Sequence, residues 1–408
     1  MNPPTVANHI VNAVLNHVRN NKDPLLATAF AAPKNPFAVQ TPTHEFSGNG
    51  ADLPIDTESE PSILLVGVDW GASKTCIKAA FAGSDGLAID ECIPTVLGYA
   101  KDGIIDGVLP DNATTLFGRE ALTHRRHLHL TCPTINSAAA ADFARHLRSR
   151  LDNIPNSEIR AVIAVPATFD AVLRNNLRQT ISEHFQSAIL LPQSYLAAIG
   201  YRDESRLLDP HYIDPVRNSI FIDIGASSTN LCLVQGYYLT AEEQLTLNFG
   251  GQNIDELLRV AILENHPDAE LSPITVRHIK EQHAFAGAAA NPLPVDIVVA
   301  GKTRTLDLSS EITASINELL IRLVDSLKTL LMTVDSDAAT ELLQNIILTG
   351  GGSRIKNIAP ELQSLLASEG FADPHVETVG PAYKDLTATG ALKAAGQARV
   401  HHWLQVAN

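Results

Sequence analysis

Two loops of this sequence combine glycine, small and hydroxyl residues with one aspartate. The first comprises Asp69, Gly71, Ala72, Ser73 and Lys74, and the second comprises Asp223, Gly225, Ala226 and Ser227. Because glycine has no Cβ, backbone N–H groups of such a loop can approach a phosphate, and serine hydroxyls add donors. An aspartate repels phosphate but can hold Mg²⁺ through water, and the metal bridges phosphate oxygens. One loop alone could be a plain β-turn, whereas two matching copies predict a clamp on a polyphosphate.

Gln193 is the candidate for positioning a water molecule. It follows the apolar run Leu190–Pro192 and precedes a small-residue helix, Leu196–Gly200. A carboxamide there could orient an attacking water by hydrogen bonding, while Asp69 and Asp223 hold the metal and Asp223 helps to activate the water. Taken by itself, Gln193 could also be an ordinary residue at the start of a helix.

Three other segments could hold the rest of a nucleotide. A glycine run lets a flat base or ribose lie against the backbone, and an arginine after it could stack on the base. Two glycines before a helix would leave free N–H groups for an anion, and a lysine within a helix could reach the ribose or the base. The residues are Gly351, Gly352 and Arg354, then Gly250 and Gly251, and Lys280. The alternatives are a flexible turn, a plain helix start and a solvated helix face.

Each aspartate loop lies between two apolar strands. Ile63–Val68 and Thr75–Phe81 flank the first loop, and Ser219–Ile222 and Leu231–Val234 flank the second. This strand–turn–strand pattern predicts a hairpin in each case. The two hairpins are separated by roughly the length of one domain, which indicates two related lobes.

Helices and strands alternate through the rest of the chain. Helices are predicted over Ala139–Leu151, Ala171–Phe185, Asp255–Glu264, Ile274–Phe285, Ser310–Val334 and from about Asn357, and strands over Ala161–Val165 and Ile346–Leu348. The order is mixed α/β, with strands in both halves. We therefore expect an α/β fold of two lobes, each with a mixed sheet flanked by helices.

Three regions are expected along the 408 residues. Residues 1–61 would combine an amphipathic helix over Thr5–Asn20 with a disordered linker rich in proline, threonine and acidic residues. Residues 62–200 would form the first domain and residues 201–395 the second. A C-terminal helix near 387–405 is expected to return to the first domain.

Composition is that of an ordinary globular protein, with 45% apolar and 18% charged residues. The net charge of -15 argues against a nucleic-acid partner, which needs a basic face. No transmembrane segment and no secretory signal is apparent, so a cytoplasmic location is expected. Cys76, Cys92, Cys132 and Cys232 form no C-x-x-C pair and are expected to be reduced. The group His124–His129 is expected on the surface rather than around a metal.

The combination of motifs resembles a known family. The two aspartate loops, the segment Ala161–Ala167 and the loop Gly350–Arg354 occur in this order in bacterial actins and in DnaK-type chaperones. The similarity runs from about residue 63 to 395. Ala261–Pro267 and Lys280–Gly287 are similar more narrowly to the magnetosome actins.

This resemblance implies an actin-like ATPase fold with ATP and Mg²⁺ in the cleft between two domains. It also implies self-association into a homopolymeric cytoskeletal filament in the cytoplasm, with slow ATP hydrolysis coupled to polymerisation. Adaptor or organelle-membrane proteins would be the other partners, and a compartment such as the magnetosome would be the cargo. Two alternatives on the same fold are a small-molecule kinase and a chaperone-like ATPase that does not polymerise.

The chain departs from the family pattern at several positions. Gln193 stands where bacterial actins usually have glutamate, and a glutamine orients water but is a poorer base. Asn230 stands where many relatives have aspartate, and Lys74 adds a positive charge beside the phosphates. These differences put the rate of hydrolysis in doubt. The N-terminal sixty residues have no counterpart in the family.

Overall fold

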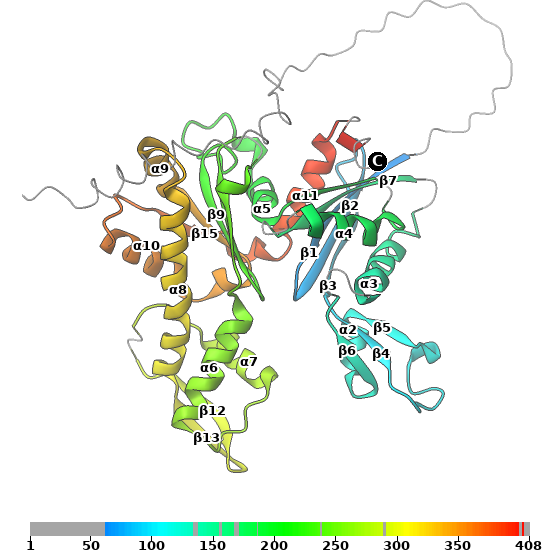
Figure 1. Cartoon of the computed structure of the whole chain (residues 1–408), viewed down its shortest axis with the longest axis horizontal. Coiled ribbons are helices and arrows are strands. Elements are labelled where there is room, and N and C mark those ends of the chain that lie inside the picture. Colours follow the sequence, from blue (N-terminus) through cyan, green and yellow to red (C-terminus); the bar gives the residue numbers. More distant parts are fainter. Residues whose placement is uncertain are drawn as a thin grey trace, which may run out of the picture. The chain divides into compact units, whose positions relative to one another are not determined.

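The computed structural model describes residues 62–133, 138–154, 157–166, 171–185, 187–236, 239–288, 291–399 and 402–403. The predicted helix Thr5–Asn20, the predicted linker, Ala167 and the end of the predicted C-terminal helix lie outside these residues. The described part forms two five-stranded sheets, one three-stranded sheet and one two-stranded hairpin, with helices between them (Figure 1).

The first five-stranded sheet contains the hairpin of the first aspartate loop. Its order is β3-β2-β1-β7-β8. The strands are β1 (Ser62–Trp70), β2 (Lys74–Phe81), β3 (Leu87–Pro94), β7 (Ser157–Val165) and β8 (Ser187–Pro192). Strands β1 and β2 are antiparallel, with Asp69 opposite Cys76, and β1 is parallel to β7. The predicted hairpin is confirmed, and the loop forms its turn.

The second five-stranded sheet repeats this arrangement around the second loop. Its order is β11-β10-β9-β14-β15. The strands are β9 (Ser219–Ile224), β10 (Thr229–Val234), β11 (Gln244–Leu247), β14 (Ile346–Thr349) and β15 (Val376–Thr378). Again the central hairpin is antiparallel and its first strand pairs in parallel with a later one. The matching strand orders support the predicted relationship between the lobes, while the bounds 62–200 and 201–395 stay a prediction.

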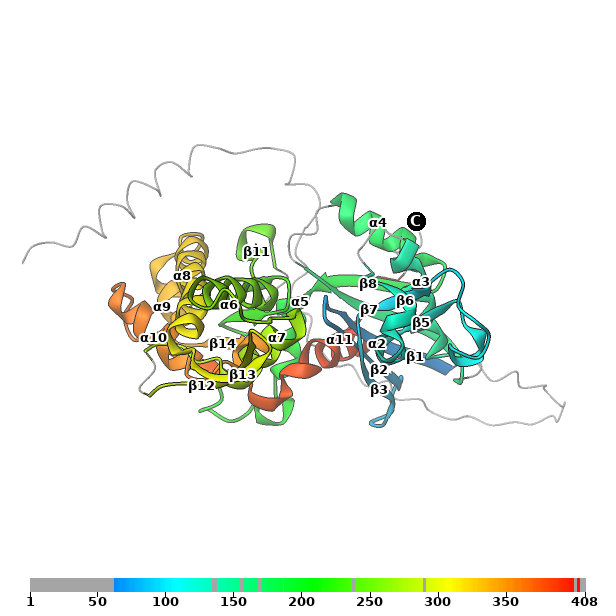
Figure 2. The ribbon, with the colours of Figure 1, turned by 90° about the horizontal axis from the view of Figure 1, so that it is seen from below.

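Helices cover both faces of the first sheet (Figure 2). They are α3 (Ala138–Ser149), α4 (Ala171–Ser182), α5 (Gln193–Tyr201) and α11 (Leu386–Gln397). Because successive side chains of a strand point to opposite faces, Ala161 and Ile163 of β7 pack with α3 and α4. Val162 and Ala164 pack instead with α5 and α11. A sheet buried on both faces explains why β7 is apolar at consecutive positions.

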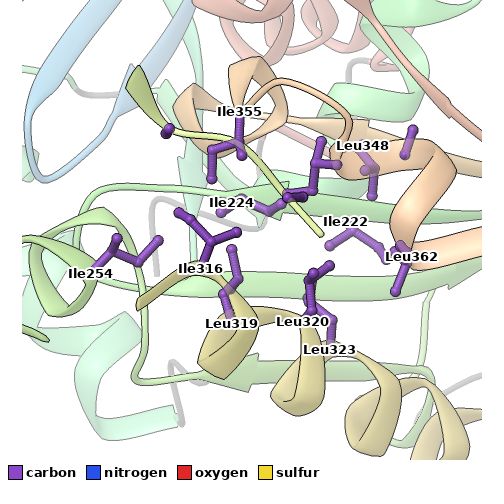
Figure 3. Close-up of a cluster of buried hydrophobic side chains, with 14 of the residues drawn as sticks. Ile222, Ile224, Ile254, Ile316, Leu319, Leu320, Leu323, Leu348, Ile355 and Leu362 are labelled. Atoms are coloured by element: carbon purple, nitrogen blue, oxygen red, sulfur yellow. The ribbon is translucent and has the colours of Figure 1, made fainter. Parts of the chain in front are cut away.

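The second sheet has its own apolar core, drawn in Figure 3. Ile222 and Ile224 of β9 pack in it with Leu319 and Leu323, and Phe221 packs on the opposite face, with α5. The helices of this half are α6 (Gly251–Asn265), α7 (Pro273–His283), α8 (Ser309–Leu331), α9 (Ser336–Leu343) and α10 (Ile358–Ser368). The predicted helices Asp255–Glu264, Ile274–Phe285 and Ser310–Val334 are thus found with slightly different ends.

Several short elements were not predicted. They include β4 (Leu97–Ala100), β5 (Thr115–Phe117), β6 (Leu128–Thr131), α2 (Gly118–Thr123), and the hairpin of β12 (Pro294–Val299) and β13 (Lys302–Asp307). Strand β13 is polar at nearly every position and exposed along most of its length, so it has no alternating pattern to reveal it. His127, just before β6, and His129, within it, are exposed as expected. No metal-binding group of three His, Cys, Asp or Glu side chains occurs among the described residues.

Helices α5 and α11 cross with their backbones in contact. A Cβ on Gly390 would overlap the carbonyl oxygen of Leu196, and one on Gly200 would overlap that of Leu386. Glycine is therefore required at both positions for this crossing. Helix α11 also packs on β1 and β7, and the expected return of a C-terminal helix to the first domain stays a prediction.

The expectation of four reduced cysteines is wrong for one pair. Cys76 and Cys92 form a disulfide with a Cα–Cα distance of 4.1 Å. They lie directly opposite each other on β2 and β3, a register that cannot be known before β3 is recognised. Cys132 and Cys232 are free thiols. No described helix is both long and apolar enough to span a membrane.

Candidate functional site

Asp69 and Asp223 occupy equivalent places at the ends of β1 and β9. Burial and then the nearby charge of Asp223 raise the pKa of Asp69 to about 7, against a hydrogen bond from Gln193 that lowers it. Burial raises the pKa of Asp223 to about 6. Two half-buried carboxyl groups with raised pKa values, one of them raised in part by the charge of the other, fit a divalent cation, which would supply positive charge between them.

The turns after these aspartates present unused backbone donors. In the first aspartate loop (loop 1) Ala72 and Ser73 are exposed, and in the second (loop 2) Ser227 is exposed. Among the described residues no backbone acceptor faces the N–H groups of Ala72, Ser73, Ala226 or Ser227. Unpaired amides in a tight turn favour binding of an anion. With the two carboxyl groups, this arrangement fits a phosphate chain that carries a divalent metal.

Helix α6 supports loop 2 in a way that was not predicted. The N–H of Gly251 donates to the carbonyl of Gly225 over 3.0 Å, and the N–H of Gln252 donates to that of Ala226 over 2.7 Å. The predicted free N–H groups at this helix start are therefore occupied. A Cβ on Gly250 would lie 2.7 Å from Ser228 N, so this glycine allows the helix to press against the loop.

Lys280 on α7 binds the first turn of α6. Its Nζ donates to the carbonyl of Gly251 over 2.7 Å and forms an ion pair with Asp255 over 2.7 Å. The lysine side chain is only 15% exposed, so this contact is largely removed from water. Lys280 thus anchors α6 beneath loop 2, and its predicted contact with a nucleoside stays a prediction.

The glycine run Gly350–Gly352 lies against Asp223, the second aspartate. Gly350 has a positive φ of 77°, and a Cβ there would overlap Oδ1 of Asp223. A Cβ on Gly352 would overlap the side chain of Ile224, whereas one on Gly351 would meet nothing within 4 Å. Gly351 therefore has open space above it, as a bound base or ribose would need. Arg354 is exposed at the end of the turn Gly351–Arg354 and forms no ion pair with a described residue.

Gln193, the first residue of α5, joins the two halves of the site. Its Nε2 donates to Asp69 Oδ1 over 3.2 Å, and its Oε1 accepts from Asn230 Nδ2 over 3.2 Å. Thr246 Oγ1 donates to Asn230 Oδ1 over 2.7 Å. Each amide group is thus oriented by its neighbours, because Asp69 Oδ1 accepts from the glutamine amide and the threonine hydroxyl donates to the asparagine oxygen.

The comparisons with known proteins agree with this geometry. A family model described as MreB/Mbl protein matches residues 66–369. The chain belongs to the MreB/Mbl family. Actin-like protein MamK of Paramagnetospirillum magneticum is 29% identical over 356 residues, which cover 84% of this chain and 95% of MamK.

Solved structures of MamK resemble this MreB/Mbl protein along most of its length. A MamK double helical filament has a TM-score of 0.72 at 28% identity and covers 82% of this chain and 99% of its own. A non-polymerising MamK mutant bound to AMPPNP has a TM-score of 0.62 at 29% identity, with the same coverage. The resemblance to bacterial actins and the actin-like α/β fold are confirmed.

Sequence reasoning missed residues that hold this MreB/Mbl site in shape. Thr95, after β3, donates from Oγ1 to the carbonyl of Gly71 over 2.6 Å and from its N–H to that of Ser73 over 3.0 Å. Its hydroxyl also contacts that of Thr75 at 2.8 Å. Asn230 was noticed only as a departure from relatives, and Thr246 was not noticed. Nothing in the local sequence marks Thr95 or Thr246, because their partners are distant along the chain.

Proposed function

We propose that this MreB/Mbl protein binds Mg²⁺–ATP between its two aspartate loops, hydrolyses it slowly and assembles into filaments. The observation that carries the proposal is the duplicated hairpin. Two equivalent turns, whose amides have no backbone acceptor among the described residues, follow two half-buried carboxyl groups, Asp69 and Asp223, whose pKa values are raised by burial and, at Asp69, by the charge of Asp223. The AMPPNP in a similar MamK structure supports a nucleoside triphosphate as the ligand.

The residues divide the work of binding. Asp69 and Asp223 would hold the hydrated metal, which when bound neutralises and bridges phosphate oxygens. The amides of Ala72, Ser73, Ala226 and Ser227 would cradle the phosphates, with Lys74 adding charge. Gly351, Gly352 and Arg354 would face the nucleoside, while Gly250, Gly251 and Lys280 would keep loop 2 in place.

Hydrolysis would be slow because Gln193 is already engaged. A carboxamide that orients water must present Oε1 or Nε2 to that water, yet here both atoms have protein partners. Gln193 would have to share or release one of them in each turnover. Asp223 would then help to take the proton of the attacking water.

Filament formation is proposed from the relatives. The similar MamK structures include a double helical filament and a mutant described as non-polymerising. A filament of this chain would serve in the cytoplasm as a track for adaptor or organelle-membrane proteins, with a compartment such as the magnetosome as cargo.

Sedimentation of the full-length protein with Mg²⁺–ATP tests the proposal. We expect micromolar protein to pellet with Mg²⁺–ATP, to stay in the supernatant with EDTA, and to release phosphate slowly. Asp223→Ala should bind nucleotide more weakly and release no phosphate. Wild-type turnover in that variant would refute the site, and failure to pellet in any nucleotide would refute the filament. Transfer of phosphate to an added sugar or acid would favour the kinase alternative.

A further inference from the structure

The Cys76–Cys92 disulfide lies between the first aspartate loop and helix α11. Cys76 follows Lys74 and Thr75 on β2, and Cys92 lies on β3, which ends just before Thr95. The two sulfurs lie 3.2 and 4.0 Å from one carbonyl oxygen, that of Lys384. Lys384 is the last residue before the helix cap Asp385. The disulfide thus lies next to β2, β3 and the segment that leads into α11.

On one side, the disulfide joins the strands that hold loop 1. Thr75 and Thr95 contact each other at 2.8 Å, and Thr95 binds the carbonyls of Gly71 and Ser73. A change in the spacing of β2 and β3 at the cysteines would therefore also shift Thr75 and Thr95, and with them the backbone of loop 1.

On the other side, the disulfide lies against an ion-pair cluster at the start of α11. Lys78 Nζ is 2.7 Å from Asp90 and 2.8 Å from Asp385, and the lysine side chain is 7% exposed. Helix α11 then packs on β1 and crosses α5, the helix that begins with Gln193. The cysteine pair therefore lies next to the start of α11, the helix that packs on the strand of Asp69 and on the helix of Gln193.

Reduction would change these contacts in two ways. Two unbonded sulfur atoms need about 3.5 Å or more between them, in contrast with about 2 Å in a disulfide, so the two side chains must rotate apart or β2 and β3 must separate locally. A free thiol can also donate a hydrogen bond to the carbonyl of Lys384, which a disulfide sulfur cannot. The oxidised form ties the strands together, and the reduced form ties β2 to the start of α11.

Access to the bond is one-sided. Cys76 is 1% exposed, whereas Cys92 on β3 is exposed. A dithiol reductant could attack Cys92 Sγ as its thiolate, breaking the S–S bond, and Cys76 would leave as a thiolate and take up a proton. The second thiol of the reductant would then displace Cys92, leaving two protein thiols and an oxidised reductant. Two electrons pass from the reductant to the protein.

We propose that Cys76–Cys92 is a reversible redox site that sets how firmly loop 1 holds nucleotide. This rests on the proposed function, since nucleotide is the ligand of that loop. In a reducing compartment a disulfide is usually transient and regulatory, and cross-linked strands pre-organise the loop. The oxidised protein should hold nucleotide more tightly and the reduced protein more weakly.

The test compares the full-length protein after treatment with oxidised glutathione and after treatment with dithiothreitol. Alkylation of the denatured protein should label Cys132 and Cys232 alone after oxidation, and all four cysteines after reduction. The dissociation constant of a fluorescent ATP analogue should rise about three- to tenfold on reduction. Cys76→Ala–Cys92→Ala should bind like the reduced protein in both conditions.

Two results would overturn the redox site: four reactive thiols after oxidation, or equal affinity in both states. Hydrogen exchange separates failure of this site from failure of the proposed function. If no nucleotide binds in either state, the proposed function fails. The switch itself then stands only if reduction still speeds exchange in β2, β3 and the first turn of α11, and it falls if their exchange is unchanged.

Discussion

The carboxamide of Asn230 on β10 donates to Oε1 of Gln193 at the start of α5 over 3.2 Å. This bond joins the second aspartate hairpin to the helix that follows the first sheet. Both residues are buried, so the bond is shielded from water and each loses more if the other is removed. The position of β10 therefore affects how freely the Gln193 side chain can rotate.

We predict that Asn230→Ala increases ATP turnover about two- to fivefold, because Gln193 Oε1 becomes available to water. Thr246→Val, which removes only the hydroxyl that orients Asn230, should give a smaller increase. Phosphate release under saturating ATP measures both, and nucleotide affinity serves as the control for misfolding. Equal or lower turnover in Asn230→Ala, with unchanged affinity, would show that the asparagine helps catalysis instead of restraining it.

The raised carboxyl pKa values predict a pH dependence of stability. Asp69 titrates at about 7 in the folded protein and ordinarily at 3.8, so between these values the folded state binds more protons than the unfolded state. Stability of the nucleotide-free protein should therefore fall as pH rises from about 4 to 7 and level off above that. Asp69→Asn should flatten this decline and be the more stable protein at pH 8, as measured by urea unfolding. A wild-type profile that rises over this range would contradict the assignment.

The same carboxyl groups predict proton release on binding. A metal–nucleotide complex would favour ionised Asp69 and Asp223, so protons should leave when it binds near pH 6. Calorimetry in two buffers of different ionisation enthalpy measures their number. Asp69→Asn should lower it, and Asp296→Asn, on the distant strand β12, should leave it unchanged.

Local pattern was enough to predict the two hairpins, the glycine run and the helix over Leu196–Gly200, which in the structure begins at Gln193. These features depend on residues close together along the chain, where apolar runs and glycines have direct meaning. Expected and observed strands differ mainly at their ends, as with Ile63–Val68 and the longer β1.

Contacts between distant segments could not be predicted in this way. The disulfide needs β3 and its register, and β3 carries alternating polar residues that were not read as a strand. The N–H groups of Gly251 and Gln252 were expected to be free because the sequence does not show that loop 2 packs against them. Thr95 and Lys280 likewise have roles that only the folded neighbours define.

Lys280 should matter for affinity more than for folding. Lys280→Met removes the contact with the carbonyl of Gly251, while Asp255 keeps Arg277 at 3.5 Å as a second partner. We expect the dissociation constant for ATP to rise about tenfold, because loop 2 loses the support beneath it. Lys302→Met, on the exposed strand β13, is the matched control and should bind like wild type. A large loss of stability with unchanged affinity would assign Lys280 to folding alone.

The crossing of α5 and α11 predicts a strong size limit at Gly390. Gly390→Ala places a methyl group against the carbonyl of Leu196, where backbone cannot yield without moving a whole helix. We expect the free energy of unfolding to fall by about 1–3 kcal/mol, as in other overpacked sites. Urea unfolding followed by circular dichroism measures this loss.

Gly396→Ala is the matched control for that crossing. It lies in the same helix, and its added Cβ would meet only Leu65 Cδ1 at 3.8 Å. Alanine is the better helix former by about 1 kcal/mol, so this variant should be as stable as wild type or more so. If both substitutions behaved alike, the helices would have room to separate. The contact between Gly390 and Leu196 would then not limit how β1 and α5, and with them Asp69 and Gln193, are held together.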